Sequence, residues 1–229
     1  MFTIKMIEIL IWVIISTIKN LSEMNSIRTL FFPTGIVHQK YIEYVGWSFI
    51  SNVLVSAESA MSTHSMLHAI GTDSETIRTA NYIGKDIIGQ IGGLAYISKM
   101  GKHSDKDPKK FLFYSNILQQ FAYASLCFTP ILPEYFLPIA GCSNILINIS
   151  FIGFGAINAK CIQALANNEN IGEIYSKISV VNTIGSSIGL LIGLGIITII
   201  PDHTLRLFVI PVLGICRVAA FNRAVKGIF

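Results

Sequence analysis

Long stretches without a charged residue dominate the second half of the chain. Three of them cover residues 111–133, 135–159 and 178–200, and a fourth, mostly apolar stretch covers 205–221. A helix rises about 1.5 Å per residue, so about 20 residues cross the roughly 30 Å hydrocarbon core of a bilayer. The pattern therefore predicts four membrane crossings after residue 110.

The first half of the chain is more polar. Small residues fill a predicted helix over 44–70, and Gly71 is expected to close it. A second helix is predicted over 72–100, with a charged start and a glycine-rich later half. Residues 26–43 contain a proline and a glycine and are predicted to connect elements. The lysine-rich stretch 99–110 is predicted to be a solvent loop.

The N-terminus forms a segment of its own. Residues 6–18 are apolar except for Glu8, a length that suits a signal-peptide core and is short for a full crossing. Glu8 is unusual in such a core, and no small-residue cleavage site follows it. We therefore expect residues 1–25 to form an amphipathic or partly embedded helix, with a targeting segment as the alternative. Residues 26–229 are predicted to form a single domain.

The distribution of basic residues gives a separate test of these crossings. If the lysine-rich stretch is cytoplasmic, the cytoplasmic segments are 99–110, 160–177 and 222–229. They carry nine lysines and arginines, whereas the outer links carry Glu134 and Asp202 and no basic residue. This agrees with the positive-inside rule, although a soluble bundle with tight turns could show the same pattern. Arg206 and Arg217 lie inside the last crossing, and we expect them to extend toward the interfaces.

Composition points to the same environment. Of the 229 residues, 52% are hydrophobic and 13% are charged, and the mean hydropathy is +0.60. Soluble proteins carry about 25% charged residues, so the composition argues against a water-soluble enzyme domain and excludes disorder. The net charge of +4 is small and scattered, which argues against a nucleic-acid partner. The expected partner is the lipid bilayer.

Three glycines recur at a spacing of four in the last long apolar stretch. Gly185, Gly189 and Gly193 fall on one helical face, where the lack of side chains lets another helix approach closely. The alternative is a flexible or kinked span. We therefore predict an all-α, polytopic membrane bundle with glycine-mediated helix packing. The same face could join the chain to a protein partner or to a second copy.

A candidate polar site lies earlier in the chain. Lys85 and Asp86 interrupt an apolar stretch, and charges at membrane depth usually face the bundle interior or a cavity. Gln90, Asn144 and Gln163 are added to this site as polar groups in or beside apolar stretches. The alternative for Lys85 and Asp86 is an ion pair at a helix end. Further amides, expected to bond between helices or to line a polar path, are Asn116, Gln119, Gln120, Asn148 and Asn158.

Catalytic and metal-binding motifs are missing from the sequence. Neither glycine cluster has the spacing of a nucleotide-binding loop. His64 and His68 share a helical face, but no third ligand is evident, so no metal site is predicted. The four cysteines are expected to be buried small hydrophobic residues. We predict no cofactor and no enzyme activity.

Several motifs follow one another in an order that is similar to a known family. They begin with Phe32-Pro33-x-Gly35, Tyr44 with Trp47, and Lys85-Asp86 with Gly89. They continue with Gly101, Asp105, Lys109, Pro130, Pro133 and Phe136. The most specific stretch matches without a gap at Asn144, Gly155, Ala156, Ala159, Gln163, Ala166, Asn170, Glu173, Lys177 and Thr183. Together they resemble the root UVB-sensitive (RUS) family, over about residues 30–195. This resemblance adds Lys177 to the candidate polar site.

The chain also departs from the family pattern. Neutral residues replace ionisable ones at several positions, including Gln90 and Asn158. If those groups carry the family's activity, this member has lost or altered it. The resemblance implies a largely helical, membrane-associated protein. Plant members are linked to UV-B responses, vitamin B6 homoeostasis and auxin transport, often in plastids, so the resemblance implies a plastid or another internal membrane.

Three functions remain after this reasoning. The leading one is a non-enzymatic scaffold or complex component, with the lysine-rich stretch contacting partners or anionic lipid headgroups. The second is a small-solute carrier whose path is lined by Lys85, Asp86, Gln90 and the amides. A membrane enzyme is the weakest, because no motif supports it.

Overall fold

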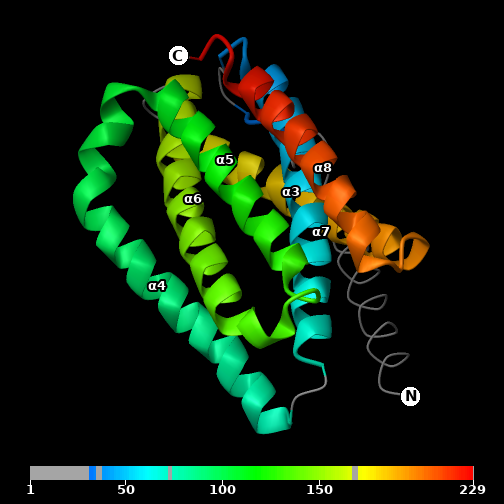
Figure 1. The fold of residues 1–229 in the computed structure, drawn as a ribbon. Coiled ribbons are helices and arrows are strands. Elements are labelled where there is room, and N and C mark those ends of the chain that lie inside the picture. The colour runs from blue at the N-terminus through cyan, green and yellow to red at the C-terminus, as the bar shows by residue number, and fades with distance from the viewer. Residues whose placement is uncertain (1–30, 35–37, 72–73, 167–169, 229) are drawn as a thin grey trace.

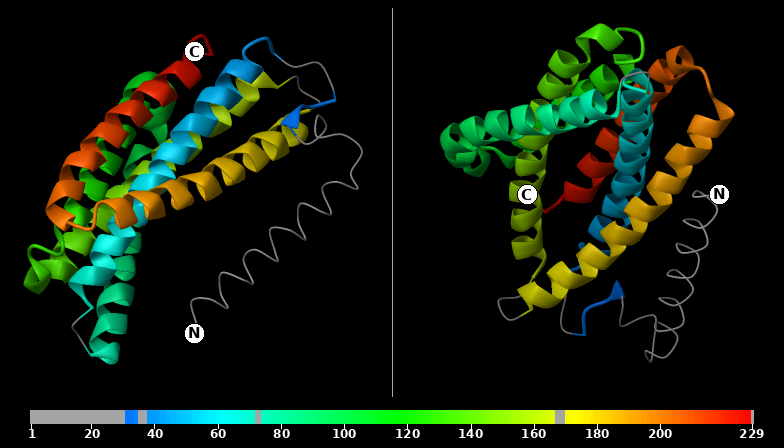
Figure 2. Two further views of the ribbon diagram at one scale, coloured as in Figure 1. Left: turned by 90° about the vertical axis from the view of Figure 1, so that its right-hand side faces the viewer. Right: turned by 90° about the horizontal axis from the view of Figure 1, so that it is seen from below.

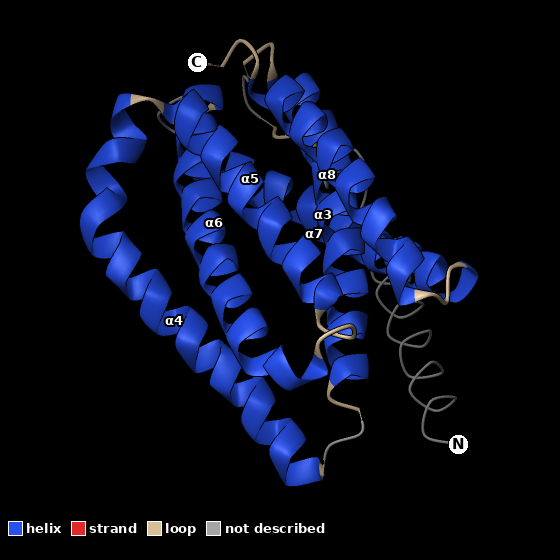
Figure 3. Ribbon diagram, in the orientation of Figure 1, coloured by secondary structure: helices blue, strands red, loops and turns tan. Residues whose placement is uncertain are grey.

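The chain folds into a bundle of long α-helices (Figures 1 and 3). The computed structural model describes residues 31–34, 38–71, 74–166 and 170–228. Within these ranges there is no β-strand, which agrees with the predicted all-α class. The expected amphipathic or targeting segment, residues 1–25, lies outside the described residues.

The helices are long and the links between them are short. They are α3 (Tyr41–Ala69), α4 (Glu75–Lys106), α5 (Pro108–Phe128), α6 (Phe136–Leu165), α7 (Ile171–Ile199) and α8 (His203–Val225), with a 3₁₀ turn η1 (Pro133–Tyr135) before α6. Successive helices run in alternating directions (Figure 1), and α7 crosses the others obliquely (Figure 2). Central to the bundle is α3, which packs against α7, α8 and α5, while α6 packs against α4 and α5.

The predicted loop at 99–110 is wrong. Helix α4 continues to Lys106, and α5 begins two residues later at Pro108. The Asp107 carboxylate accepts a hydrogen bond from the Lys110 backbone N–H, at 3.2 Å, and so caps α5. That hydrogen bond also lowers the pKa of Asp107. The link between the two helices is therefore the single residue Asp107, which the polar composition of the stretch did not reveal.

One end of the bundle gathers the basic residues. We call it the basic end: the start of α3, the α4–α5 and α6–α7 links, and the end of α8 (Figure 1). Described basic residues near it are Lys40, Lys109, Lys110, Lys160, Lys177, Arg223 and Lys226. Glu134 and Asp202 lie in the links at the opposite end. The alternating path therefore places the segments predicted to be cytoplasmic on one side.

Polar side chains lie inside the bundle beside its apolar core, and large apolar side chains cover much of its outside. Along its length α3 buries Ser48, Ser51, Ser56, Glu58, Ser62 and Ser65. In contrast, α7 and α8 expose large apolar side chains, among them Leu191, Leu194, Ile199, Phe208 and Ile215. Exposed apolar surface on this scale is unfavourable in water and favourable in hydrocarbon.

Among the residues that the structure describes, three helices are long and apolar enough to cross a membrane: α6 together with η1, α7, and α8. They coincide with the crossings predicted at 135–159, 178–200 and 205–221. The fourth prediction, 111–133, is not among them. Helix α5 ends at Phe128, and its polar residues, among them the buried Asn116 and Gln119, make it too polar to count as a membrane-spanning helix.

The prediction for the cysteines is half right. The four cysteines, all in the described part of the chain, are free. Cys127 and Cys161 are buried, but Cys142 and Cys216 are exposed on α6 and α8. Sequence context did not separate these pairs, because all four cysteines lie in or beside apolar stretches.

The three spaced glycines of α7 lie against α3 of the same chain. A Cβ atom at Gly185 would stand 3.1 Å from the Phe49 ring, and one at Gly193 would stand 2.7 Å from Ala60 Cβ. At Gly189 it would overlap the Val53 carbonyl oxygen. The backbone of α7 thus approaches the backbone of α3 at this point.

Candidate functional site

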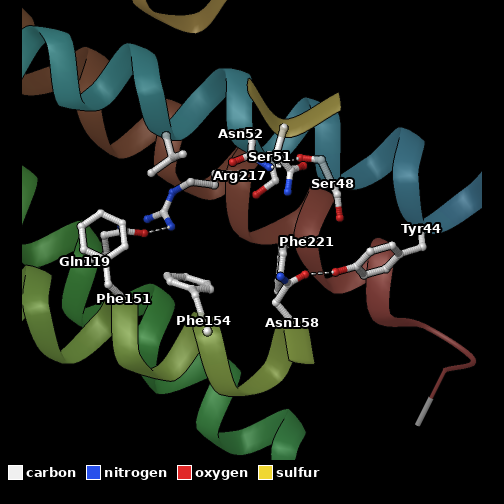
Figure 4. Close-up of a pocket in the computed structure, with 13 residues that line it drawn as sticks. Tyr44, Ser48, Ser51, Asn52, Gln119, Phe151, Phe154, Asn158, Arg217 and Phe221 are labelled. Atoms are coloured by element: carbon white, nitrogen blue, oxygen red, sulfur yellow. Dashed lines mark hydrogen bonds between the residues drawn. The ribbon is translucent and has the colours of Figure 1, made fainter. Parts of the chain in front are cut away.

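A polar cavity of about 260 Å³ lies where five helices meet (Figure 4). We call it the first cavity, and it lies toward the basic end. Its lining is Tyr44, Ser48, Ser51, Asn52 and Val55 of α3, Gln119 of α5, Phe151, Phe154, Gly155 and Asn158 of α6, Asn182 of α7, and Arg217 and Phe221 of α8. The α3 residues recur three or four apart, so they share one face of that helix.

Hydrogen bonds between helices hold the mouth of this cavity. The Tyr44 hydroxyl donates to Asn158 Oδ1 at 2.7 Å, which joins α3 to α6 (Figure 4). Asn52 Nδ2 donates to Asn182 Oδ1 at 2.8 Å, which joins α3 to α7. The buried Ser48 hydroxyl makes no hydrogen bond to any described residue. Buried polar groups are normally paired, and the Ser48 hydroxyl, which lies near Tyr44, could also pair with a bound molecule.

An ion pair closes the inner side of the first cavity. Arg217 Nε of α8 lies 2.9 Å from Glu58 Oε2 of α3, and the two side chains are 1% and 0% exposed. Neither Glu58 oxygen accepts a well-oriented hydrogen bond from the described residues. The carboxylate is therefore held by charge and proximity to the guanidinium.

Neutral amides of α5 surround the same guanidinium. Arg217 Nη1 donates to Asn116 Oδ1 at 3.0 Å and to Gln119 Oε1 at 2.7 Å, while Nη2 donates to Gln120 Oε1 at 3.2 Å. Gln120 Nε2 in turn donates to the Ile210 carbonyl of α8 at 2.9 Å. The amides expected to bond between helices do so here, and they hold both terminal nitrogens of Arg217.

A second cavity, of about 150 Å³, lies further from the basic end. Its lining is Ser59, Ser62, Thr63 and Met66 of α3, Tyr82 and Lys85 of α4, Tyr123 and Leu126 of α5, and Ala140, Asn144 and Ile147 of α6. Lys85 is 6% exposed. Its ammonium lies 2.6 Å from Asp86 Oδ1 and 4.0 Å from the centroid of the Tyr82 ring.

The structure brings together three residues of the predicted polar site. Asn144 Nδ2 donates to Asp86 Oδ1 at 2.9 Å and to the Lys85 carbonyl at 3.1 Å. Gln90 lies further along α4 and is exposed. Gln163 is exposed near the other end of α6, about 28 Å from Asn144 at 1.5 Å per residue. Lys177 is half-buried on α7, a helix that packs mainly on α3.

The sequence reasoning missed the ion pair. Arg217, expected to extend to an interface, is instead enclosed by Glu58 and the amides. Arg206 was expected to do the same, and it is also buried. It donates to the Ile200 and Pro201 carbonyls at 2.7 and 2.8 Å, and to His64 Nδ1 at 2.8 Å. The sequence did contain a signal for this ion pair, because Glu58 and Arg217 are charged residues inside helices with few other charges.

Three histidine rings gather at the end opposite the basic end. The His203 ring centroid lies 4.0 Å from that of His68 and 5.7 Å from that of His64. Within the described chain, no group of histidine, cysteine or acidic residues has an arrangement that could hold a metal ion. The Arg206 guanidinium beside His64 also disfavours a cation there.

Comparison with known proteins links the chain to one family. The family model for the vitamin B6 photo-protection and homoeostasis domain matches residues 18–229. Protein root UVB sensitive 4 of Arabidopsis thaliana is 28% identical over 181 residues, which are 77% of this chain and 35% of that protein. Protein root UVB sensitive 2, chloroplastic, of the same plant is 23% identical over 211 residues, or 90% of this chain and 48% of that protein.

A relative outside plants is similar to the same degree. RUS family member 1 of Dictyostelium discoideum is 24% identical over 194 residues, covering 81% of this chain and 37% of that protein. The chain thus spans about a third to a half of the length of these curated relatives. No solved structure matches the chain.

Proposed function

The chain belongs to the root UVB sensitive family, and on that premise we propose that it is a membrane-integral carrier of small polar solutes. The observation that carries this proposal is the first cavity, to which five helices of an apolar-surfaced bundle contribute polar groups. Sequence reasoning ranked a scaffold first. We now place the carrier first, because a carrier needs a cavity with polar groups between its helices and a scaffold does not.

The membrane setting is the first part of the proposal. It is supported by the length and apolar surfaces of α6, α7 and α8, and by the gathering of basic residues at one end. The chain would be multi-pass, with its basic end on the cytoplasmic or equivalent side of an internal membrane. One relative carries the word chloroplastic in its name, so a plastid membrane is one candidate location.

Alkaline carbonate extraction tests this setting. We expect the tagged chain to stay in the membrane pellet, because α6, α7 and α8 would be held by their exposed apolar side chains. A soluble protein expressed beside it is the control and should be released. Release of the chain into the supernatant would contradict the membrane proposal.

The lining of the first cavity suggests the solute. Phe151, Phe154 and Phe221 offer apolar faces to a planar ring, and Asn52, Ser48 and Ser51 offer hydrogen bonds to hydroxyl groups. Arg217 adds a positive charge at the inner side. The family description names vitamin B6, whose forms are small hydroxylated pyridine rings, some of them phosphorylated. We therefore propose a vitamin B6 compound as the solute.

Transfer rather than chemistry is proposed for this cavity. Its described lining residues include no histidine, cysteine or carboxylate that could act as a general base or a nucleophile beside the serines. The cavity can bind and orient a molecule, and the chain is therefore proposed to be non-enzymatic.

A binding measurement tests the site. Purified protein in detergent should bind pyridoxine or pyridoxal 5′-phosphate, and Asn158→Leu should weaken that binding at least tenfold, about 1.4 kcal/mol. The substitution removes the acceptor of the Tyr44 hydroxyl and places a bulky apolar group in the cavity. Gln163→Leu, on the exposed face of the same helix, is the matched control and should bind normally. Equal affinities of the two variants would remove the first cavity as the site.

A scaffold role remains the second candidate. The face of α7 turned away from α3 exposes Leu190, Leu191 and Leu194, which a partner helix could cover as well as lipid could. A scaffold should co-purify with a protein partner and lose it on Leu191→Asn, while neither binding nor moving any vitamin B6 compound.

A further inference from the structure

The two cavities lie one behind the other along the bundle. On α3 the first is lined by residues between 44 and 55 and the second by residues between 59 and 66. On α6 the corresponding residues lie between 151 and 158 and between 140 and 147. Because α3 and α6 run in opposite directions, both helices place the first cavity toward the basic end and the second toward the opposite end (Figure 1).

A thin polar layer separates the cavities. Glu58 stands on α3 between Val55 of the first lining and Ser59 of the second, and it pairs with Arg217. On α5, Gln119 lines the first cavity and Tyr123 the second, and Gln119 Nε2 lies 3.5 Å from the Tyr123 hydroxyl. The barrier is therefore made of charged and hydrogen-bonding side chains from three helices.

This layer is built in an unusual way for a permanent seal. Apolar residues of similar volume could close a helical bundle without removing any charge from water. Burying an ion pair removes two charges from water, and this free-energy cost is offset only when the pair also makes good hydrogen bonds. Here the Glu58 oxygens have unused acceptor capacity. Arg217, in contrast, keeps amide partners on α5 if Glu58 moves away. If the pair separates, Nη1 and Nη2 of Arg217 therefore keep hydrogen-bond partners, and only Nε loses its neighbour.

The second cavity holds the chemistry to receive an anion. The Lys85 ammonium is nearly fully buried, and its carboxylate partner, Asp86, is 44% exposed at the side chain. A phosphate or carboxylate entering from the cavity could replace Asp86 at Lys85, with the Tyr82 ring and the Asn144 amide beside it.

We propose that the two cavities are consecutive binding stations on one solute path and that the Glu58–Arg217 pair is the gate between them. Lys85 holds the anionic group of the solute at the second station. This inference rests on the proposed carrier function. It adds the route, the gate and a second site to that function.

Cysteine accessibility tests the gate without knowledge of the solute. In a background with Cys127, Cys142, Cys161 and Cys216 changed to alanine, Gly155→Cys reports on the first cavity and Ser59→Cys on the second. Gly155 has open space around it, and serine to cysteine is nearly isosteric, so both changes should be tolerated. A charged, membrane-impermeant methanethiosulfonate reagent is added to sealed vesicles of either orientation.

The gate predicts opposite sidedness. Gly155→Cys should react from the basic-end side and Ser59→Cys from the other side, each at least tenfold faster than from the wrong side. The double change Glu58→Gln with Arg217→Gln should let each thiol react from both sides. Gln119→Ala is the second opening variant, because it thins the barrier and keeps the ion pair. Restoring Cys216 alone provides the control thiol, exposed on the apolar outside of α8, which should stay unreactive.

A protection measurement tests the second station. Inorganic phosphate at millimolar concentration should slow the reaction of Ser59→Cys severalfold, and Lys85→Gln should abolish this protection. Reaction of both thiols from the same side with the ion pair intact would overturn the gate. The gate would also be overturned if neither the Glu58→Gln, Arg217→Gln double variant nor Gln119→Ala changed the side from which each thiol reacts. Absence of phosphate protection would overturn the role of Lys85. These measurements need no vitamin B6 compound. The gate can therefore be confirmed even if vitamin B6 is not the solute, and vitamin B6 binding can be confirmed even if the gate is wrong.

Discussion

Arg217→Met is expected to cost the folded protein about 3–5 kcal/mol, the range for breaking a buried ion pair by removing one partner. The substitution leaves the Glu58 carboxylate fully buried and without its charged partner. It also removes the donor to three amides of α5. The free energy of unfolding, measured in mixed micelles by titration with a denaturing detergent, gives the difference.

The matched control for this change is Arg223→Met. Arg223 lies less than two turns further along α8, is exposed, and stacks its guanidinium at 5.1 Å from the Trp47 ring centroid. Losing an exposed cation–π contact should cost less than about 1 kcal/mol. Adding Glu58→Gln to Arg217→Met should restore much of the lost stability, because a neutral amide is far cheaper to bury than a charge. Equal losses for Arg217→Met and Arg223→Met would contradict the buried ion pair.

The sequence predicted those helices whose position follows from a long apolar run alone. Helices α6, α7 and α8 overlap runs whose length matches a bilayer, and such runs need no tertiary information, but α6 continues to Leu165 and α7 begins at Ile171, outside those runs. Capping is a finer effect. The hydrogen bond to Asp107 and the proline after it mark the start of α5, so the lysine-rich stretch holds the end of one helix and the start of the next.

The candidate site was harder to predict because its parts come from distant positions. Lys85 and Asp86 are neighbours in sequence, and their placement in an apolar stretch was a sufficient signal. Asn144 lies beside this pair, whereas Gln163, which also interrupts an apolar helix, lies on an exposed face. The pairing of Glu58 with Arg217 depends on how α3 and α8 pack, which periodicity in a single chain does not specify.

The packing of α3 on α7 leads to the second large expected effect, which Gly189→Ala should show. Alanine in place of glycine normally stabilises a helix interior by about 0.5–1 kcal/mol. At Gly189 the new methyl group would overlap the Val53 carbonyl oxygen and stand 2.7 Å from Ser56 Cβ. A backbone atom cannot rotate away as a side chain can, so α3 and α7 must separate, and overpacking of this kind costs about 1–3 kcal/mol or more.

Gly195→Ala is the control on the same helix. A Cβ atom there meets nothing within 4 Å, so this variant should be as stable as the original chain or slightly more stable. The two variants therefore should differ in sign in the same unfolding titration. Equal stabilities would show that the close approach of α7 to α3 is not needed.

The same substitution should also weaken solute binding at the first cavity. Helix α3 carries Glu58 and Asn52, and the Asn52 amide bonds to Asn182 of α7, so separation of the two helices would disturb the cavity lining. A loss of binding with Gly189→Ala but not with Gly195→Ala would tie the glycine contact to the site as well as to the fold.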